Sequence, residues 1–338
     1  MKQKRKALSP AQAAQWAQMA HALYLEALMT QTGWSAGEFA FHGGTSLRLS
    51  WHSSRHSEDL DFLLSRKFGD LAGMARKTGA ALAEMARRVD ANFVITLQDK
   101  TKDAARIAAY LITVSHPDYI GTAKIKAEFW RTKPAYLQKY PTQLRTPAAR
   151  DAALDFYSLV SHPVPAATLE TAYADKLVAF ATRPYLKWRD LYDLWWIGTQ
   201  TTARLDINAL CKQFLHNISA YTPLQNLPPA KALALFLKHG KQDLVKMADP
   251  GIKTWLPASL WARIHPDGIG EIVDYVLYAI DSVAAHLEHG NRGTVNLNAL
   301  PPPARKLAGR PAVRRPARPA ASSDARQVTR TQSDSPLA

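Results

Sequence analysis

One stretch of the sequence constrains the fold more than any other. Residues 39–49 read FAFHGGTSLRL, and residues 59–64 read DLDFLL. The first segment has the pattern of a short apolar strand over 38–42, a glycine pair and the start of a helix. The second alternates charged and apolar residues, as a half-buried strand does. Together they predict an α/β or α+β domain whose mixed sheet is flanked by helices.

The rest of the chain divides into two textures around residue 150. Before it, a helix is predicted from Ser9-Pro10 to about residue 30, a second over 70–88, and strands over 93–97, 106–114 and 123–130. After it, helical patterns dominate, with Pro and Gly between them. The predicted helices cover 166–182, 187–198, 207–217, 229–239, 256–264 and 269–288.

These patterns predict four regions. Residues 1–35 form a helix packed on the core, 36–150 the sheet domain, 151–297 a helical domain, and 298–338 a disordered basic tail. A length of 338 residues fits about two folded domains. The tail is rich in Pro, Arg, Ala and Ser and has no aromatic residue, so it lacks the apolar surface needed to order itself.

The charge balance favours an anionic partner. The formal net charge is +15, part of which lies in the tail. Nucleic acid, nucleotides and an anionic surface all fit such a balance. The single cysteine excludes an internal disulfide, and no apolar run of about 18 residues exists, so we expect a cytoplasmic protein without a membrane span.

Asp59 and Asp61 are the first candidates for chemistry. In a strand, residues i and i+2 project from the same face, which places the two carboxylates side by side. Their repulsion is relieved by a cation, and Mg²⁺ prefers such oxygen ligands. Glu58 alternates to the other face and is not expected to be a ligand. The alternative is a strand end with solvated acids.

The glycine pair upstream has the properties of a phosphate-binding turn. Gly43 and Gly44 allow close approach of a ligand, and the following helix N-terminus directs free N–H groups at an anion. Thr45 and Ser46 add hydroxyl donors. The segment lacks the GxxxxGK[ST] pattern, and a tight turn with a helix cap is the alternative.

Two more residues complete the candidate set around the acids. Arg55 precedes them and pairs either with a carboxylate or with a phosphate, unless it is a surface arginine. Glu128, in KIKAEFW, is the best candidate for a third acid in a two-metal site. An ordinary solvent-facing Lys–Glu pair on that strand is the alternative.

The helical region contains a dense charged segment, ADKLVAFATRPYLKWRDLYDLWWI. Lys176 and Arg183 are seven residues apart and share a face if the helix continues. Such cations opposite a metal centre would hold a triphosphate. Alternatively, the segment is a solvated face, or its aspartates lock one helix to the next. The tryptophans fit core packing better than base stacking. The charged residues are Lys176, Arg183, Lys187, Arg189, Asp190 and Asp193.

In this order, GGTSLRL, RHSEDLDF, KIKAEF and ADKLVAFATRPYLKWRDLYDL resemble the AbiEii/AbiGii toxin family of bacterial nucleotidyltransferases, within the polymerase-β-like superfamily. The resemblance spans about residues 36–198. It implies a nucleotidyltransferase-type mixed sheet with flanking helices, followed by a C-terminal helical domain. It also implies the toxin of a type IV toxin–antitoxin or phage-defence pair, whose separately encoded antitoxin need not bind the toxin directly.

The resemblance also implies roles for individual residues. Gly44 and Thr45 match the triphosphate-binding motif, and Asp59 and Asp61 match the metal-binding pair. Glu128 lies where the family has its third sheet acid. Lys176 and Asp190 match the helical motif, with Lys176 on the nucleotide.

The expected reaction transfers NMP from NTP to an acceptor hydroxyl, with RNA, at the tRNA 3′ end, as the expected acceptor. The phosphates would lie over Gly43–Ser46, with Arg55, Lys176 and Arg183 as further ligands and Mg²⁺ on Asp59, Asp61 and Glu128. Two alternatives stay open: modification of a small molecule or protein, and a catalytically inactive nucleic-acid-binding relative. Mg²⁺-dependent NTP binding separates the inactive relative from an enzyme.

Overall fold

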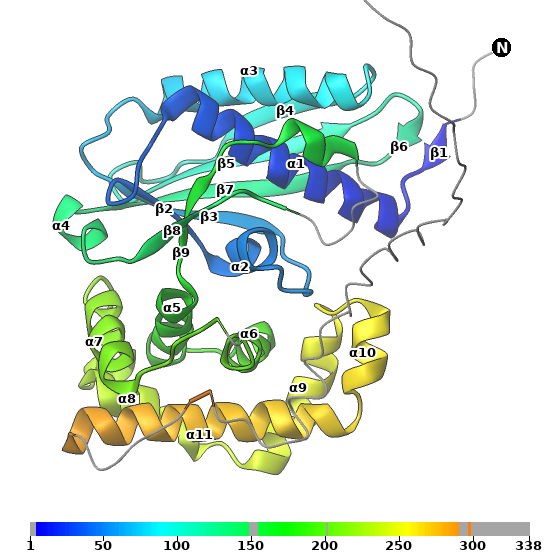
Figure 1. The fold of residues 1–338 in the computed structure, drawn as a ribbon. Coiled ribbons are helices and arrows are strands. Elements are labelled where there is room, and N and C mark those ends of the chain that lie inside the picture. The colour runs from blue at the N-terminus through cyan, green and yellow to red at the C-terminus, as the bar shows by residue number, and fades with distance from the viewer. Residues whose placement is uncertain (1–4, 149–154, 201, 291–296, 299–338) are drawn as a thin grey trace, which may run out of the picture. The chain divides into compact units, whose positions relative to one another are not determined.

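The centre of the computed structural model is a seven-stranded mixed sheet (Figure 1). The structure describes residues 5–148, 155–200, 202–290 and 297–298. β3 is antiparallel to β2 and parallel to β7, so it lies between two neighbours of opposite direction near the middle of the sheet. The strand order is β4 (Val94–Asp99), β5 (Ile107–Ser115), β7 (Ala123–Thr132), β3 (Asp59–Ser65), β2 (Phe39–His42), β9 (Val164–Ala167) and β8 (Thr142–Arg145).

Two long helices, α1 (Pro10–Thr32) and α3 (Leu71–Val89), cover one face of this sheet (Figure 1). Ser9 caps α1 through a capping box with Gln12, and Gly33 ends it in the left-handed conformation. Phe62 and Phe129 stack across the middle of the core, with ring centroids 4.7 Å apart. The face that carries Phe62 is therefore closed, and functional side chains on β3 must project from the other face.

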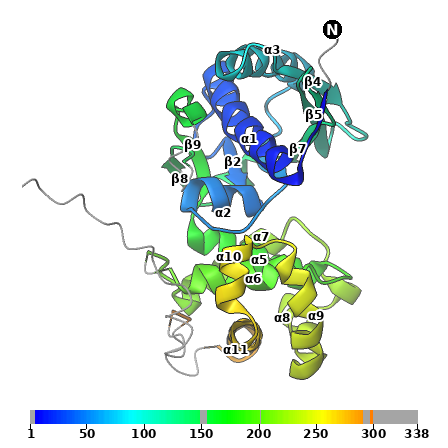
Figure 2. The same cartoon turned by 90° about the vertical axis from the view of Figure 1, so that its right-hand side faces the viewer.

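The helices after residue 168 build a second hydrophobic core. The longest, α11 (Asp267–His289), is seen nearly end-on in Figure 2 and contacts most of the others. Leu47, which follows strand β2 in the sequence, is also buried in this core. The other helices are α5 (Leu169–Thr182), α6 (Trp188–Gly198), α7 (Ile207–Ile218), α8 (Pro229–Ala234), α9 (Lys241–Lys253) and α10 (Ala258–Ile264).

Helix α2 (Gly43–Trp51) links these two parts, and the remaining elements are short. This helix follows β2 directly and packs against α5. The remaining elements are β1 (Lys6–Ala7), which pairs with β6 (Tyr119–Ile120), α4 (Pro134–Leu137) and the 3₁₀ turns η1 (Asp155–Leu159), η2 (Leu224–Asn226) and η3 (Leu235–Lys238). Among the described residues, no helix has the length and apolar character needed to cross a bilayer.

The predicted fold class is confirmed, and the differences are local. Residues 166–168 were predicted as helix, but Ala166 and Ala167 end β9 and Thr168 caps α5. Helix α9 was not predicted because it contains Pro250, yet the burial of Leu244, Ala248 and Ile252 keeps it helical. All described residues lie within one compact unit spanning 1–308. The predicted tail lies outside the described residues, except for Asn298.

Candidate active site

Three acids face the same side of the sheet where β3 and β7 meet. Leu60 and Phe62 are fully buried on one face of β3, so Asp59 and Asp61 project from the opposite face. The parallel register places Asp61 directly beside Glu128 of β7. The sequence-predicted acids are therefore brought together by two neighbouring strands rather than by one loop.

The glycine pair is required by what lies against it. Gly43 has a φ of +76°, and a Cβ atom there would collide with the Asp61 carboxylate. At Gly44 a Cβ would collide with the guanidinium of Arg55 and the hydroxyl of Ser57. The start of α2 thus lies in contact with the strand that carries the acids, which leaves its first N–H groups beside them.

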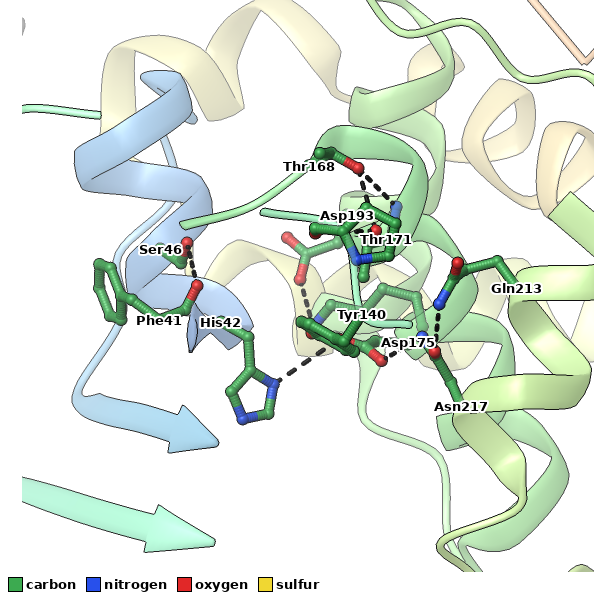
Figure 3. Close-up of polar contacts among 12 residues, drawn as sticks. Phe41, His42, Ser46, Tyr140, Thr168, Thr171, Asp175, Asp193, Gln213 and Asn217 are labelled. Carbon is green, nitrogen blue, oxygen red and sulfur yellow. Dashed lines mark hydrogen bonds and ion pairs between the residues drawn. The ribbon is translucent and has the colours of Figure 1, made fainter. Parts of the chain in front are cut away.

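The hydroxyls of Thr45 and Ser46 have partners inside the protein. Thr45 donates to the Asp59 carbonyl and lies 2.9 Å from the Ser57 hydroxyl, while Ser46 donates to the Phe41 carbonyl at 3.1 Å (Figure 3). Both side chains are buried, and neither is among the residues that line the cavity described below. In this structure the two hydroxyls fasten α2 to β2 and β3, unlike the phosphate-facing arrangement predicted from the sequence.

A buried chain of ion pairs joins the loop before β3 to the helices. Arg55 binds Asp193 through two N–H groups, one of them at 2.7 Å. Lys176 contacts both Asp190 and Asp193 at 2.7 Å, and Arg183 contacts Asp190 at 2.6 Å. Of the alternatives for Arg55, the structure has the carboxylate pairing, and the two aspartates do lock α6 to α5.

This chain of ion pairs carries three cations and two anions, so it presents a positive wall. Burial alone would raise the pKa of the Asp190 and Asp193 carboxyls, but the adjacent cations outweigh it and lower both pKa values. Arg183 remains 39% exposed and is the member most open to a ligand. The aspartates are held ionised, which fixes Lys176 and Arg183 in place.

The acids and the cations line a common cavity of about 460 Å³. It is bounded by the sheet on one side and by α5 and α6 on the other. Most of the sequence-predicted site residues line it: Gly43, Gly44, Arg55, Asp59, Asp61, Glu128, Lys176, Arg183 and Asp190.

The electrostatics of the acidic side of the cavity favour a cation. Burial raises the pKa of Asp59, and the charges of Asp61 and Glu128 raise it further. Lys126 offsets part of this by pairing with Glu128 at 2.5 Å, so the Lys–Glu pair considered from the sequence is also present.

The acids fit Mg²⁺ in the way nucleotide enzymes hold it. Within the described residues, no three His, Cys, Asp or Glu side chains form a ready-made metal cluster. Mg²⁺ bound with a nucleotide uses one or two carboxylates and takes its other ligands from phosphates and water. Asp59 and Asp61, adjacent on one face and open to the cavity, match that requirement.

Comparison with known protein families identifies the family that matches this chain. The family model described as nucleotidyl transferase AbiEii toxin, type IV toxin–antitoxin system, matches residues 28–257, more than half of the sequence. The chain belongs to this family. It is therefore a nucleotidyltransferase of the AbiEii toxin type, with an NTP as substrate and an antitoxin as its genetic partner. The resemblance inferred from the motifs is confirmed.

Similar solved structures include two bacterial proteins. JHP933 from Helicobacter pylori is 17% identical with a TM-score of 0.49, over 84% of this chain and 97% of that protein. MenT4, a nucleotidyltransferase toxin from Mycobacterium tuberculosis, is 17% identical with a TM-score of 0.47, over 88% of each. Among curated proteins, none matches this AbiEii chain.

Several cavity-lining residues were not predicted from the sequence. His42 precedes the glycine pair and contacts Asp175 at 3.6 Å, and Asp175 also accepts hydrogen bonds from Tyr140 and Asn217 (Figure 3). Asp175 is adjacent to Lys176 in the charged segment and gave no separate signal. The cavity is also lined by Trp130, Tyr221, Lys187 and Arg189.

The tryptophans of the charged segment are structural, as their spacing predicted. Trp195 and Trp196 are buried in the helical core, and Trp188 packs against it. Trp130, by contrast, follows Glu128 by two residues on the same strand face. Strand alternation beyond the third acid was the signal that could have found it.

Proposed function

We propose that this AbiEii protein transfers an NMP from an NTP to a hydroxyl of RNA, at the tRNA 3′ end, in a Mg²⁺-dependent reaction. The observation that carries the proposal is the composition of the cavity. Acids of β3 and β7 line one side, and cations of α5 and the loop that follows it line the other. A nucleoside triphosphate with bound Mg²⁺ needs both: cationic side chains for its phosphates and acidic side chains for the metal ion.

The phosphates are bound by this chain's cations and helix N-terminus. The first N–H groups of α2, at Gly43 and Gly44, supply neutral donors to an anion. Lys176 and Arg183 supply positive charge from α5 and its C-terminal cap, and the buried aspartates keep both in position. Arg55 contributes indirectly, because its guanidinium is engaged by Asp193.

Asp59 and Asp61 would hold Mg²⁺, which supplies charge stabilisation of the attacking and leaving oxygens. The acceptor oxygen forms a bond to the α-phosphorus, and the bond from the α-phosphorus to the bridging oxygen breaks, so pyrophosphate leaves. The proton of the acceptor hydroxyl passes to the Glu128 carboxylate. Lys126, 2.5 Å from Glu128, stabilises that carboxylate before it accepts the proton.

An RNA acceptor is supported by charge. The chain carries 43 Lys and Arg residues against 28 Asp and Glu residues. A basic surface attracts polyanions and disfavours cationic small molecules. The acids gathered in the cavity argue against an inactive relative that only binds nucleic acid, because neighbouring carboxylates repel RNA phosphates unless a cation neutralises them.

The test is incubation of the purified protein with each labelled NTP, Mg²⁺ and total cellular RNA. We expect label in a tRNA band with one NTP, loss of that label with EDTA and its return with added Mg²⁺. Label in no RNA band contradicts the RNA acceptor, and label on protein would redirect the proposal to a protein hydroxyl. Transfer that persists after complete chelation contradicts the metal dependence.

A further inference from the structure

Two aromatic rings line the cavity, and the chemistry proposed above uses neither. Trp130 of β7 and Tyr221, in the turn after α7, have ring centroids 6.1 Å apart and planes tilted by 47°. We call this pair the aromatic wall. Trp130 lies two residues after Glu128 on the same strand face, so the wall begins next to the acids.

Each ring leaves part of its surface open. Trp130 packs on a small apolar cluster that includes Leu63 and Tyr140, but it is only partly buried and lines the cavity. Tyr221 is 37% exposed, although it is a large aromatic residue. Aromatic surface left open inside a largely charged cavity is costly to hydrate and is available to an apolar ligand group.

The turn that carries Tyr221 is anchored by hydrogen bonds of the buried Asn217 at the end of α7. Asn217 donates to Asp175 at 2.8 Å and accepts from Gln213 at 2.6 Å (Figure 3). The backbone carbonyl of Asn217 accepts a hydrogen bond from the Tyr136 hydroxyl at 3.2 Å. The turn then places Tyr221 against Trp130. The backbone N–H of Tyr221 donates to the Ile218 carbonyl at 2.9 Å, so the turn that carries the ring is tied to the end of α7.

The surroundings of Tyr221 place it close to the reacting groups. Burial and then the charge of Asp175 raise the pKa of its hydroxyl, and the charges of Arg183 and Asp61 also act on it. The ring lines the same cavity as Arg183, a cation assigned to the triphosphate, and Asp61, an acid assigned to Mg²⁺. A nucleotide bound by those groups has one flat apolar part, its base.

We propose that the aromatic wall stacks a nucleobase of the substrate; this inference rests on the proposed nucleotide transfer. The two rings are in contact, so the base stacks on their cavity side rather than between them. Stacking is tolerant of base identity, because every base has a π-face. The base belongs either to the NTP or to the terminal nucleotide of the acceptor RNA, and the experiment distinguishes the two.

The experiment measures two affinities and one KM for matched variants. Trp130→Leu and Tyr221→Leu remove a ring but keep an apolar side chain, whereas Trp130→Phe and Tyr221→Phe keep a ring. Tyr278→Leu removes another exposed tyrosine, in α11 and outside the cavity. The measurements are the Kd of NTP, the Kd of inorganic tripolyphosphate, and the KM for RNA.

We expect the leucine variants to weaken binding about tenfold and the phenylalanine variants to retain it. A weaker NTP Kd assigns the wall to the donor base, and a higher KM for RNA assigns it to the acceptor base. Tripolyphosphate binding should not change, since it has no base. Tyr278→Leu should match the wild type throughout.

If both leucine variants keep the wild-type Kd for NTP and the wild-type KM for RNA, the aromatic wall does not stack a base and the proposal is wrong. An equal loss of NTP and tripolyphosphate binding also overturns it, because that pattern indicates a disturbed phosphate site. If the wild-type protein binds no NTP, the proposed function and the proposed base stacking are both wrong. A wild type that binds NTP while the leucine variants bind it equally, with an unchanged KM for RNA, contradicts the wall alone.

Discussion

The buried ion pairs around Lys176 decide how the two cores are joined. Arg55 and Asp193 are 1% and 0% exposed, and both carry full charge in an environment with little water. A buried pair adds little net stability over an apolar pair, but removal of one partner leaves the other unpaired. The stability of the junction therefore depends on keeping all members present.

Replacement of Asp193 by alanine should strongly destabilise the fold. The Arg55 guanidinium would remain buried without its bidentate partner, at a cost of about 3–5 kcal/mol in the free energy of unfolding. Urea unfolding measures this cost. Lys241→Met is the matched control, because Lys241 and Asp274 form an exposed pair that should contribute at most about 1 kcal/mol. Similar losses in the two variants would contradict the account.

Gly43 tests the contact between the phosphate turn and the acids. Gly43→Ala forces an L-residue into positive φ and drives a Cβ into the Asp61 carboxylate. We expect NMP transfer to fall about a hundredfold, because a displacement of about 1 Å at a reacting group has that effect. Gly33→Ala shares the positive φ but meets open space, so it should lose about 1 kcal/mol of stability and keep its activity. Equal activities in the two variants would refute the contact.

At the scale of elements, α1 depends on a neutral histidine. His21 is buried in the middle of α1, with Nε2 2.8 Å from the Glu58 carbonyl, just before β3. Burial lowers the pKa of His21 to about 4 from a usual value of 6.5. The contact therefore ties the helix that covers the sheet to the start of the strand that carries the acids.

This histidine predicts a pH dependence of stability. The unfolded state binds the proton of this histidine more readily than the folded state does. The stabilisation of the fold by neutral His21 is therefore fully present above pH 6.5 and is lost as the pH falls toward 4. His21→Phe removes the titration. Relative to that variant, the wild-type free energy of unfolding should fall by about 3 kcal/mol between these pH values. Parallel pH profiles of the two proteins would show that His21 is not buried in the neutral form.

How far the sequence predicts each element depends on the range of the contacts that form it. β3, α2 and α5 carry local signals, namely strand alternation, the glycine turn and helical periodicity, and these predicted the type of each element correctly. β9 reads VPAA and is a strand because it pairs with β2, more than 120 residues earlier in the chain, which no local pattern contains. α9 keeps its helix through Pro250 because α11 buries one of its faces.

The site follows the same rule. Asp59, Asp61 and Glu128 were predictable because strand alternation fixes their direction. Lys176 and Arg183 were found from spacing and from the family motif. Tyr221 was not predictable, because it follows α7 and meets Trp130 only through the tertiary fold. The partner of Arg55 was unresolved for the same reason: Asp193 is 138 residues away.

At the scale of the whole molecule, two groups of basic residues attract a polyanion such as RNA: the cations of the cavity and the arginines of the C-terminal segment. The cavity has its own cations, and residues 309–338 add six arginines and two aspartates to the chain. Electrostatic attraction of RNA by such a segment requires no specific contact and is screened by salt. The cavity alone is expected to select the nucleotide.

Removal of residues 309–338 should weaken RNA binding while NTP binding stays unchanged. The slope of log Kd for RNA against log salt should decrease in magnitude by about 0.7 for each lost phosphate contact. Filter binding at several salt concentrations measures it for the full and shortened chains. Identical slopes would show that this segment makes no contact with RNA.

The central claim is that Asp59 and Asp61 form the acidic half of a nucleotidyl transfer site completed by α5 and its C-terminal cap. Its most direct test is transfer of labelled NMP by Asp61→Asn beside Glu58→Gln, with thermal unfolding to verify both folds. Loss of a charge worth several kcal/mol should reduce transfer by Asp61→Asn at least about a hundredfold, while Glu58→Gln, at an exposed residue that does not line the cavity, stays within about twofold of wild type. A folded Asp61→Asn protein that transfers NMP at the wild-type rate would contradict the account.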